Sequence, residues 1–268
     1  MKVATLQMNS GPDVAANLDA AGTLLSGAAT AGAVLAVLPE NFAIMGAKEA
    51  DRLAVAENIG AGPIQDAIAD LAQKLSLWVV AGTLPIRGHS ANRVAPASLV
   101  FDANGKQVAR YDKMHLFDVD LPGKGEIYRE SATFEPGKEP IVVETPVGKL
   151  GLSVCYDLRF PELYRQLSAR GAQLLAVPAA FTVPTGRVHW EVLLRARAVE
   201  NLCYVLAAAQ WGAHANGRET YGDAMIVDYW GRVLGRRAVG VGVVVAEVDT
   251  AAQTSVRASF PALQHRVL

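Results

Sequence analysis

The sequence predicts a layered α/β protein, from its composition and from two alternating patterns. Of the 268 residues, 51% are hydrophobic and 19% are charged, which excludes a chain that is disordered throughout. Short runs rich in Val, Leu and Ala, bounded by Gly, Pro or Asn, alternate with longer stretches of helical period. Length alone does not separate one domain from two, but neither a linker nor an internal repeat interrupts the series.

The apolar runs have the length of β-strands, and turn-forming residues bound them. Their number indicates two sheets. The predicted strands are 3–8, 33–38, 78–83, 97–101, 107–111, 141–144, 150–154, 173–177, 203–209, 224–228 and 242–248.

Three segments are predicted to be helices. The first, 63–75, begins with Pro63, whose missing N–H has no partner at that position, and its apolar residues share one face. The second runs from Pro161 to the residue before Gly171. The third, 188–201, has an apolar stripe with a charged flank, as a helix covering a sheet would.

The charges and cysteines exclude several classes of partner. Lys plus Arg number 25 and Asp plus Glu number 26, so the net charge of −1 offers no basic field, and we expect no nucleic-acid ligand. The two cysteines, Cys155 and Cys203, lie in apolar runs and lack the spacing of a secreted disulfide framework. We therefore expect a cytoplasmic protein.

An uncharged stretch over 20–38 has the length of a membrane span. Gly27 and Gly32 interrupt it, and Pro39 and Glu40 end it where a span needs an apolar or anchoring flank. The N-terminal apolar run is too short for the core of a signal peptide. We therefore expect no association with a membrane.

The segment 149–178 places a cysteine at a strand end. An apolar run ends at Cys155, the letters YDLRF break the pattern, and a helix and a further strand follow. In open α/β sheets, ligands bind at the carboxyl ends of strands, where turn N–H groups can face a developing oxyanion. By position alone, however, Cys155 would more often be a small buried hydrophobe than a nucleophile.

Glu40 and Lys113 also follow strands directly, Glu40 in LPEN and Lys113 after VARYD. Taken singly, these residues have the ordinary interpretation of a loop acid and a surface lysine. Together with Cys155 they supply an acid, a cation and a thiol, which suffice for acyl transfer without histidine. The five histidines do not pair at metal-ligand spacing, so we expect no metal site.

Three motifs in order resemble the catalytic segments of the nitrilase superfamily of carbon–nitrogen hydrolases. They are LPEN with Glu40, YDKMHLFDVDLPGKG with Lys113, and CYDLRFPELYR with Cys155. The resemblance extends from the N-terminal strand to the final PALQHRVL. True nitrilases typically read Cys-Trp-Glu, whereas CYDLRFPE is similar to the branch that contains omega-amidase and deaminated glutathione amidase.

The resemblance implies a four-layer αββα sandwich in a single domain over 1–268, subunits associated into at least a homodimer, and no metal or organic cofactor. It also implies that Glu130 is a second glutamate that orients the lysine. For the mechanism we expect a thioester: Glu40 takes the Cys155 proton, and Lys113 and the Tyr156 N–H stabilise the oxyanion. The substrate that the resemblance implies is a small α-keto acid bearing a terminal primary amide, which is hydrolysed to a carboxylate and ammonia.

Three residues are candidates for substrate contact. Arg159 follows the cysteine and could pair with a substrate carboxylate or, equally, with Asp157 or Glu162. Phe181 and Thr182 follow a predicted strand; Phe181 could equally be core.

The segment 184–231 is more similar to deaminated glutathione amidase than to omega-amidase, chiefly through AAAQ followed by Gly and His. Asn41, Leu158, Asp223 and the end at Leu268 depart from that pattern, and Asn41 could border the pocket. The alternatives are an omega-amidase, an N-carbamoyl hydrolase and a catalytically silent interaction module.

Overall fold

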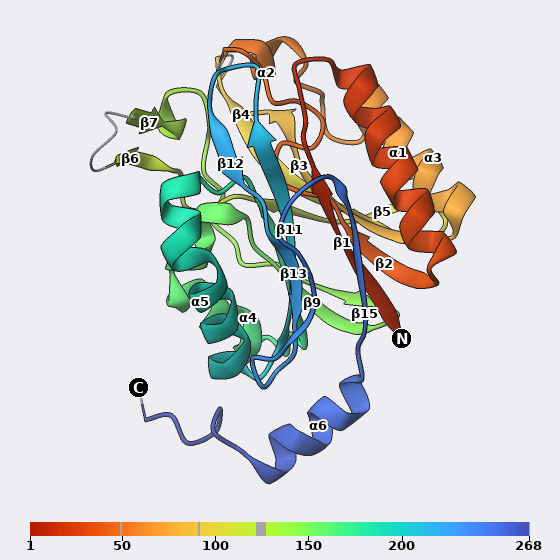
Figure 1. Ribbon diagram of the computed structural model, residues 1–268, viewed down its shortest axis with the longest axis vertical. Coiled ribbons are helices and arrows are strands. Elements are labelled where there is room, and N and C mark those ends of the chain that lie inside the picture. The colour runs from red at the N-terminus through yellow and green to blue at the C-terminus, as the bar shows by residue number, and fades with distance from the viewer. Residues whose placement is uncertain (49, 91, 122–126, 268) are drawn as a thin grey trace.

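The computed structural model describes residues 1–48, 50–90, 92–121 and 127–267. Its described strands form one continuous network of 13 strands and one separate pair. Within the large network two sheets pack face to face, and helices cover the outer side of each (Figure 1). This arrangement confirms the four-layer αββα sandwich.

The first sheet has the order β5-β4-β3-β2-β1-β15. β1, β2 and β3 are parallel, and the outer strands pair antiparallel with them. The bounds are β1 Lys2–Met8, β2 Ala33–Val37, β3 Trp78–Arg87, β4 Val94–Phe101, β5 Gln107–Asp112 and β15 Gly242–Glu247.

The second sheet has the order β8-β9-β10-β11-β13-β14, with β9, β10 and β11 parallel. β12 pairs with the far end of β11. The bounds are β8 Val142–Thr145, β9 Gly148–Leu152, β10 Leu174–Ala179, β11 Tyr204–Ala213, β12 Glu219–Tyr221, β13 Ala224–Val227 and β14 Val233–Arg237.

The two sheets join where β1 meets β11. Gln7 pairs with Ala209 and Met8 pairs with Gln210, in parallel register. Along the rest of its length β1 pairs with β15 on that side. The two sheets that the strand count indicates are thus one hydrogen-bonded network with a short junction.

Alternation along β1 shows how the layers form. Ala4, Leu6 and Met8 pack in the apolar cluster that includes α1 and α3, because side chains two apart share a face of a strand. Val3 points the other way, into the cluster that extends through the second sheet to α4 and α5.

α1 and α3 cover one outer face and α4 and α5 cover the other, whereas α2 lies at the edge of the sandwich and α6 extends away from it (Figure 1). α1 is Val14–Thr30, α2 Ala50–Ala54, α3 Pro63–Leu75, α4 Pro161–Ala169, α5 Val183–Asn201 and α6 Thr250–Ser259. α3 has the predicted bounds. α5 begins before the predicted start at 188, because Thr182 is an extended N-cap and the proline after Val183 fits the first turn.

The uncharged stretch over 20–38 is divided between two elements. Its first part lies in α1, Gly32 makes a turn at φ 85°, and its last part forms β2. No helix among the described residues is long and apolar enough to cross a membrane.

The sequence analysis did not predict α1, α2, α6, β12, β14 or the separate β6–β7 pair, Asp118–Asp120 with Ile127–Arg129. Each strand of the β6–β7 pair has three residues, as does β12, which is too short to show an alternating pattern. α1 is rich in Ala and Gly, so its sequence does not show a clear alternation of apolar and polar residues at the helical period.

Gly82 allows a close approach that positions the turn after β2. It lies at φ 29° where the register between β3 and β4 shifts, and a Cβ there would collide with the carbonyl oxygen of Pro39. The next residue, Thr83, accepts a hydrogen bond from the Asn41 N–H at 2.8 Å. This irregularity in β3 therefore supports the Pro39-Glu40 turn.

Replacing Gly82 with alanine should destabilise the protein by about 1–3 kcal/mol, because the added methyl group overpacks against the Pro39 backbone. The matched control is Gly27→Ala in α1, where a Cβ would lie 3.7 Å from Val243 and the helix should gain about 0.5–1 kcal/mol. Urea unfolding of both variants measures the difference. Equal effects would contradict this account of Gly82.

Candidate active site

The three residues of the motifs lie at the carboxyl ends of three strands. Glu40 lies in the turn after β2, Lys113 directly follows β5, and Cys155 begins a short 3-10 helix, Cys155–Arg159, after β9. β2 and β5 belong to the first sheet and β9 to the second. The packing of the two sheets therefore brings these strand ends together. The motif around Lys113 runs on to residues 122–125, which lie outside the described residues.

Lys113 is a fully buried cation between two carboxylates. Its Nζ lies 2.9 Å from Glu40 Oε1 and 3.0 and 2.8 Å from the two carboxylate oxygens of Glu130. Burial alone would lower the pKa of Lys113, but the charges of Glu130 and Glu40 outweigh it and raise this pKa well above its usual value. The lysine therefore stays protonated at any physiological pH.

Both glutamates are fixed by further hydrogen bonds. Glu40 Oε2 accepts from the Ala180 N–H at 2.8 Å, and Glu130 Oε2 accepts from the Phe117 N–H at 2.8 Å. Burial, the largest effect, raises the pKa of Glu130, and the charge of Glu40 raises it too, while Lys113 opposes both. Glu40 is 4% exposed, so its second oxygen cannot be stabilised by bulk water and depends on the Ala180 amide.

Gln210 supports the backbone of Glu40 from the sheet junction. Its Nε2 donates to the Glu40 carbonyl at 3.1 Å and to Ser10 Oγ at 2.7 Å, and its Oε1 accepts from the Ser10 N–H at 3.0 Å. Gln210 is fully buried. This is the glutamine of the AAAQ motif, and its contacts give the motif a structural role.

Cys155 is held in a strained turn at the inner end of a cavity. Its φ of 49° is in the left-handed region that non-glycine residues seldom adopt. Cys155 is 8% exposed. Burial raises the pKa of Cys155 well above its usual value, and the negative charge of Glu40 raises it further, while Lys113 lowers it in part. The resting form is therefore the thiol.

The 3-10 helix that starts at Cys155 leaves its first amides without partners inside the helix. The Tyr156 N–H is one of these amides. An amide without a helical partner and a buried ammonium are the kinds of donor that stabilise an oxyanion.

A cavity enclosing about 750 Å³ of empty space, open solvent at its mouth included, leads to these groups. Four of its lining residues are the sequence-predicted Tyr156, Arg159, Phe181 and Thr182, and Asn41 also borders it. Glu40, Glu130 and Cys155 line this cavity, whereas Lys113 is fully buried and does not line it.

Arg159 pairs with neither Asp157 nor Glu162 among the described residues. Its Nη1 lies 3.3 Å from His189 Nδ1, and its guanidinium lies over the rings of Phe181 at 5.3 Å and Tyr156 at 5.9 Å. The salt bridge that the sequence left open is thus absent from the described part of the chain. The Arg159 side chain forms part of the cavity wall.

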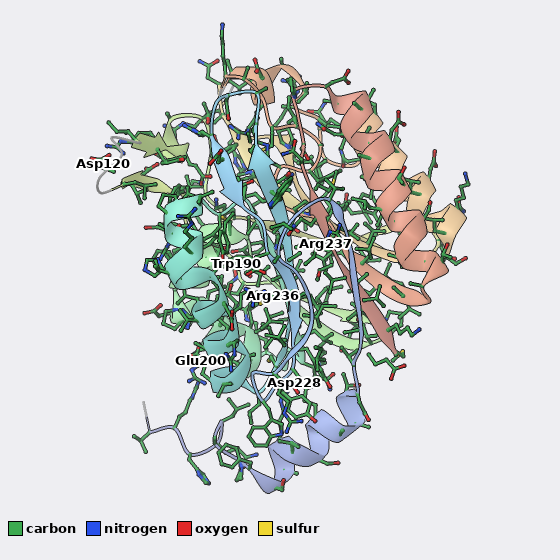
Figure 2. The ribbon with its side chains drawn as sticks, in the orientation of Figure 1. Asp120, Trp190, Glu200, Asp228, Arg236 and Arg237 are labelled. Atoms are coloured by element: carbon green, nitrogen blue, oxygen red, sulfur yellow. The ribbon has the colours of Figure 1, made fainter. Side chains whose placement is uncertain are left out.

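Phe181 serves both as core and as cavity wall. It is 5% exposed and packs against Trp190 at 4.9 Å between ring centroids. Trp190 lies between α5 and the second sheet (Figure 2), and its indole N–H donates to the Asp223 carbonyl at 2.8 Å. These contacts make Trp190 a packing residue, and it is not among the residues that line the cavity.

The sequence analysis missed much of the cavity wall. The missed side chains come from α2 and the segment before it, the β6–β7 pair and its flanks, the first turn of α5 and the β11–β12 hairpin. They are Met45, Arg52, Phe117, Tyr128, Arg129, Phe134, Thr185, Asn216, Arg218, Glu219 and Thr220. Three of them are arginines, so with Arg159 the wall has four guanidinium groups. No group of three or more His, Cys, Asp or Glu residues within the described ranges has the geometry of a metal site.

A sequence comparison assigns the chain to a family. The sequence model of carbon-nitrogen hydrolases matches residues 2–258. The chain belongs to the carbon-nitrogen hydrolase family.

Relatives of this carbon-nitrogen hydrolase match over nearly its whole length. The deaminated glutathione amidase of Yersinia enterocolitica is 42% identical over 264 residues, which cover 98% of this chain and 92% of the relative. The crystal structure of the NitFhit protein of Caenorhabditis elegans is 40% identical with a TM-score of 0.92, covering 99% of this chain and 65% of that one.

A third relative carries a covalent adduct. It is a variant of the amidase of Nesterenkonia sp. AN1, described with the acetamide moiety of fluoroacetamide added at its active-site cysteine. It is 29% identical with a TM-score of 0.82, covering 100% of this chain and 94% of that chain.

The pKa directions predict how the thiol responds when one charge is removed. In Glu40→Gln the pH midpoint of Cys155 alkylation should move to lower pH, because Glu40 raises the thiol pKa and Lys113 lowers it. The rate of labelling by iodoacetamide across pH measures this midpoint.

Cys203 is an internal control for this measurement, since burial raises the pKa of its thiol to about 12 and keeps it unreactive. A Cys155→Ser protein gives the background. An unchanged or higher midpoint in Glu40→Gln would contradict the charge balance described above.

Proposed function

We propose that the chain is a cysteine-dependent amidase in which Glu40, Lys113 and Cys155 form the catalytic triad. The observation that carries this proposal is the buried Lys113 ammonium, bound by Glu40 and Glu130 and placed beside the Cys155 thiol at the inner end of the cavity. A buried cation beside a thiol and a carboxylate supports thioester chemistry.

The reaction begins with proton transfer from the Cys155 thiol to Glu40 as the sulfur attacks the amide carbonyl. The carbonyl oxygen becomes an oxyanion, which the Lys113 ammonium and the Tyr156 N–H stabilise. Glu40 then protonates the leaving nitrogen, the carbon–nitrogen bond breaks, and a thioester remains. Glu40 next takes a proton from water, whose oxygen attacks the thioester, and returns a proton to the sulfur as the acid leaves.

Glu130 acts on Lys113 rather than on the substrate carbonyl. Its two oxygens, at 3.0 and 2.8 Å from Nζ, fix the direction of the ammonium and keep it charged. An oxyanion donor must be oriented before the reaction to be effective, since reorientation costs free energy in the transition state. Glu130 is thus a supporting residue of the triad.

The substrate we propose is deaminated glutathione, the compound in the name of the Yersinia relative. The acyl group of this compound is joined to the nitrogen of cysteinylglycine, a secondary amide, so the leaving group would be that peptide and not ammonia. The compound carries a carboxylate at each end. Arg159 lies on the cavity wall and pairs with neither Asp157 nor Glu162 in the described part of the chain, and this supports binding of one substrate carboxylate by its guanidinium.

We also propose that the protein acts as a homodimer, or a larger homo-oligomer, formed by the outer face of α5. Val188, Val192 and Val199 on this helix and Trp230 beside it are exposed, although large apolar side chains are usually buried. Sedimentation velocity on wild type and Val192→Glu would test this, with a monomeric wild type as the contradicting result.

Both cysteines are free thiols, which supports a cytoplasmic location and a single domain that needs no disulfide.

The first test of the function compares two substrates. Wild type should hydrolyse deaminated glutathione, with cysteinylglycine as the released product, in preference to 2-oxoglutaramate, from which ammonia is released. Cys155→Ala should abolish turnover and remain folded by circular dichroism, and Lys113→Met should lower kcat about 10²–10³-fold through loss of one oxyanion donor.

The contradicting outcomes of this test are distinct. Preference for 2-oxoglutaramate would make the protein an omega-amidase. Turnover by a folded Cys155→Ala protein would overturn the triad.

A second test concerns Arg159. Arg159→Gln should raise KM for deaminated glutathione about tenfold or more, because a charge-assisted hydrogen bond to a carboxylate contributes about 1.5–3 kcal/mol. For the diester of deaminated glutathione, in which both carboxylates are esterified, Arg159→Gln should change KM little. A uniform rise in KM for both compounds would contradict carboxylate binding by Arg159.

A further inference from the structure

Asp157 is a fully buried carboxylate, two residues after the thiol, that the mechanism does not use. It accepts hydrogen bonds from two separate segments. Oδ2 accepts from the Val154 N–H at 2.8 Å and from the Tyr111 hydroxyl at 2.7 Å. Oδ1 lies 3.0 Å from the His115 N–H and 2.7 Å from His115 Nδ1. These four groups compensate the burial of the carboxylate.

On one side, Asp157 closes the turn that contains Cys155. While Oδ2 accepts from the Val154 N–H, the Asp157 N–H donates to the Val154 carbonyl at 3.0 Å. This reciprocal pair spans Cys155 and its φ of 49°. A residue in that region costs about 1–3 kcal/mol and persists only where the surroundings fix it.

On the other side, Asp157 binds the residues that flank Lys113. Tyr111 and His115 lie two positions before and two positions after the lysine, and both contact the same carboxylate. The Tyr111 hydroxyl also accepts from the Met114 N–H at 3.3 Å. The segment that carries Lys113 is therefore fixed at both of its ends by one side chain.

The partners of Asp157 are themselves restrained. Burial, followed by the charge of Asp157, raises the pKa of Tyr111 well above its usual value, so its hydroxyl remains a donor. The His115 ring stacks on Phe160 at 3.7 Å between centroids and 6° between planes. This stacking keeps Nδ1 directed at the carboxylate.

Asp157 does not line the cavity and cannot touch the substrate. We propose that Asp157 is a positioning residue that sets the placement of the Lys113 ammonium relative to the Cys155 sulfur. The carboxylate is the common partner of the turn that supplies the nucleophile and the segment that supplies the oxyanion donor. Misplacement of either by about 1 Å is enough to slow a reaction about 10²-fold.

This inference rests on the proposed triad, and two reactions of Cys155 separate it from a general structural role. Acylation by p-nitrophenyl acetate passes through an oxyanion: the thiolate attacks the ester carbonyl and p-nitrophenolate leaves. Alkylation by iodoacetamide displaces iodide at a saturated carbon and forms no oxyanion. Only the first reaction needs Lys113 in register with the sulfur.

The variant Asp157→Asn keeps the shape of the side chain and removes its charge. We expect its acylation rate to fall about 10–100-fold while the alkylation rate falls less than threefold, with thermal unfolding showing that the variant is folded. A proportionate loss in both reactions, or no loss in either, would overturn the proposal.

Two tyrosines provide a matched pair for the same assay. Tyr111 and Tyr164 are both fully buried, but only Tyr111 donates to Asp157, since the Tyr164 hydroxyl pairs with Ser153 at 2.8 Å. Tyr111→Phe should lower acylation selectively in wild type and have little further effect in Asp157→Asn, whereas Tyr164→Phe should show no such selectivity. Equal behaviour of the two tyrosine variants would overturn the proposal.

The ester assay does not depend on the natural substrate. If wild type hydrolyses neither deaminated glutathione nor 2-oxoglutaramate but Asp157→Asn still loses acylation selectively, the proposed substrate fails and the positioning role stands. If the amides are hydrolysed but Asp157→Asn shows no selective loss of acylation, the proposed amidase function stands and the positioning role of Asp157 fails.

Discussion

A buried positive charge governs the arrangement of this active site. Lys113 has no access to water, so it requires carboxylates close by, and Glu40 and Glu130 supply them. The formal charges sum to +1 − 2 = −1, and ionisation of the Cys155 thiol alone would bring the cluster to −2. A proton shift from sulfur to Glu40 keeps the total at −1. Burial and then the charge of Glu40 raise the pKa of the Cys155 thiol, while Lys113 opposes them, so the carboxylate that stabilises the lysine also favours the protonated thiol.

The fold meets this requirement by joining strand ends from two sheets. The turn after β2 needs the irregularity of β3 at Gly82, the Ala180 amide at the end of β10, and Gln210 at the junction of the sheets. The other half of the site depends on Asp157, which binds the segments on both sides of the sandwich core. No single element orients the reacting groups, so the precision of the site is a property of the packed sheets as a whole.

The elements that could be predicted from the sequence are those with a regular hydrophobic pattern or a short, contiguous motif. Buried strands such as β2 and β10 are continuous apolar runs, and α3 carries a proline and an apolar face, so these elements were visible. Glu40, Lys113 and Cys155 each follow a strand, and their three motifs resemble those of a known family, so they were found by position and resemblance together. The missed arginines of the cavity wall are Arg52 in α2, Arg129 in a strand of three residues and Arg218 in the loop before β12, and no hydrophobic period there identifies the side chains that face the cavity. The contacts of Asp157 with Tyr111 and His115 were missed because these residues lie more than forty positions away, a separation that motif spacing does not reveal.

The support that Gln210 gives to Glu40 also bears on the order of events during synthesis. All four ionisable groups of the cluster lie in the first 155 residues, yet the Glu40 backbone is bound by a side chain near position 210, at the strand that joins the sheets. A growing polypeptide on the ribosome would therefore carry every reacting group well before the residue that fixes the first of them has been added. The Glu40 turn therefore gains this support only after β11 has been synthesised and has paired with β1.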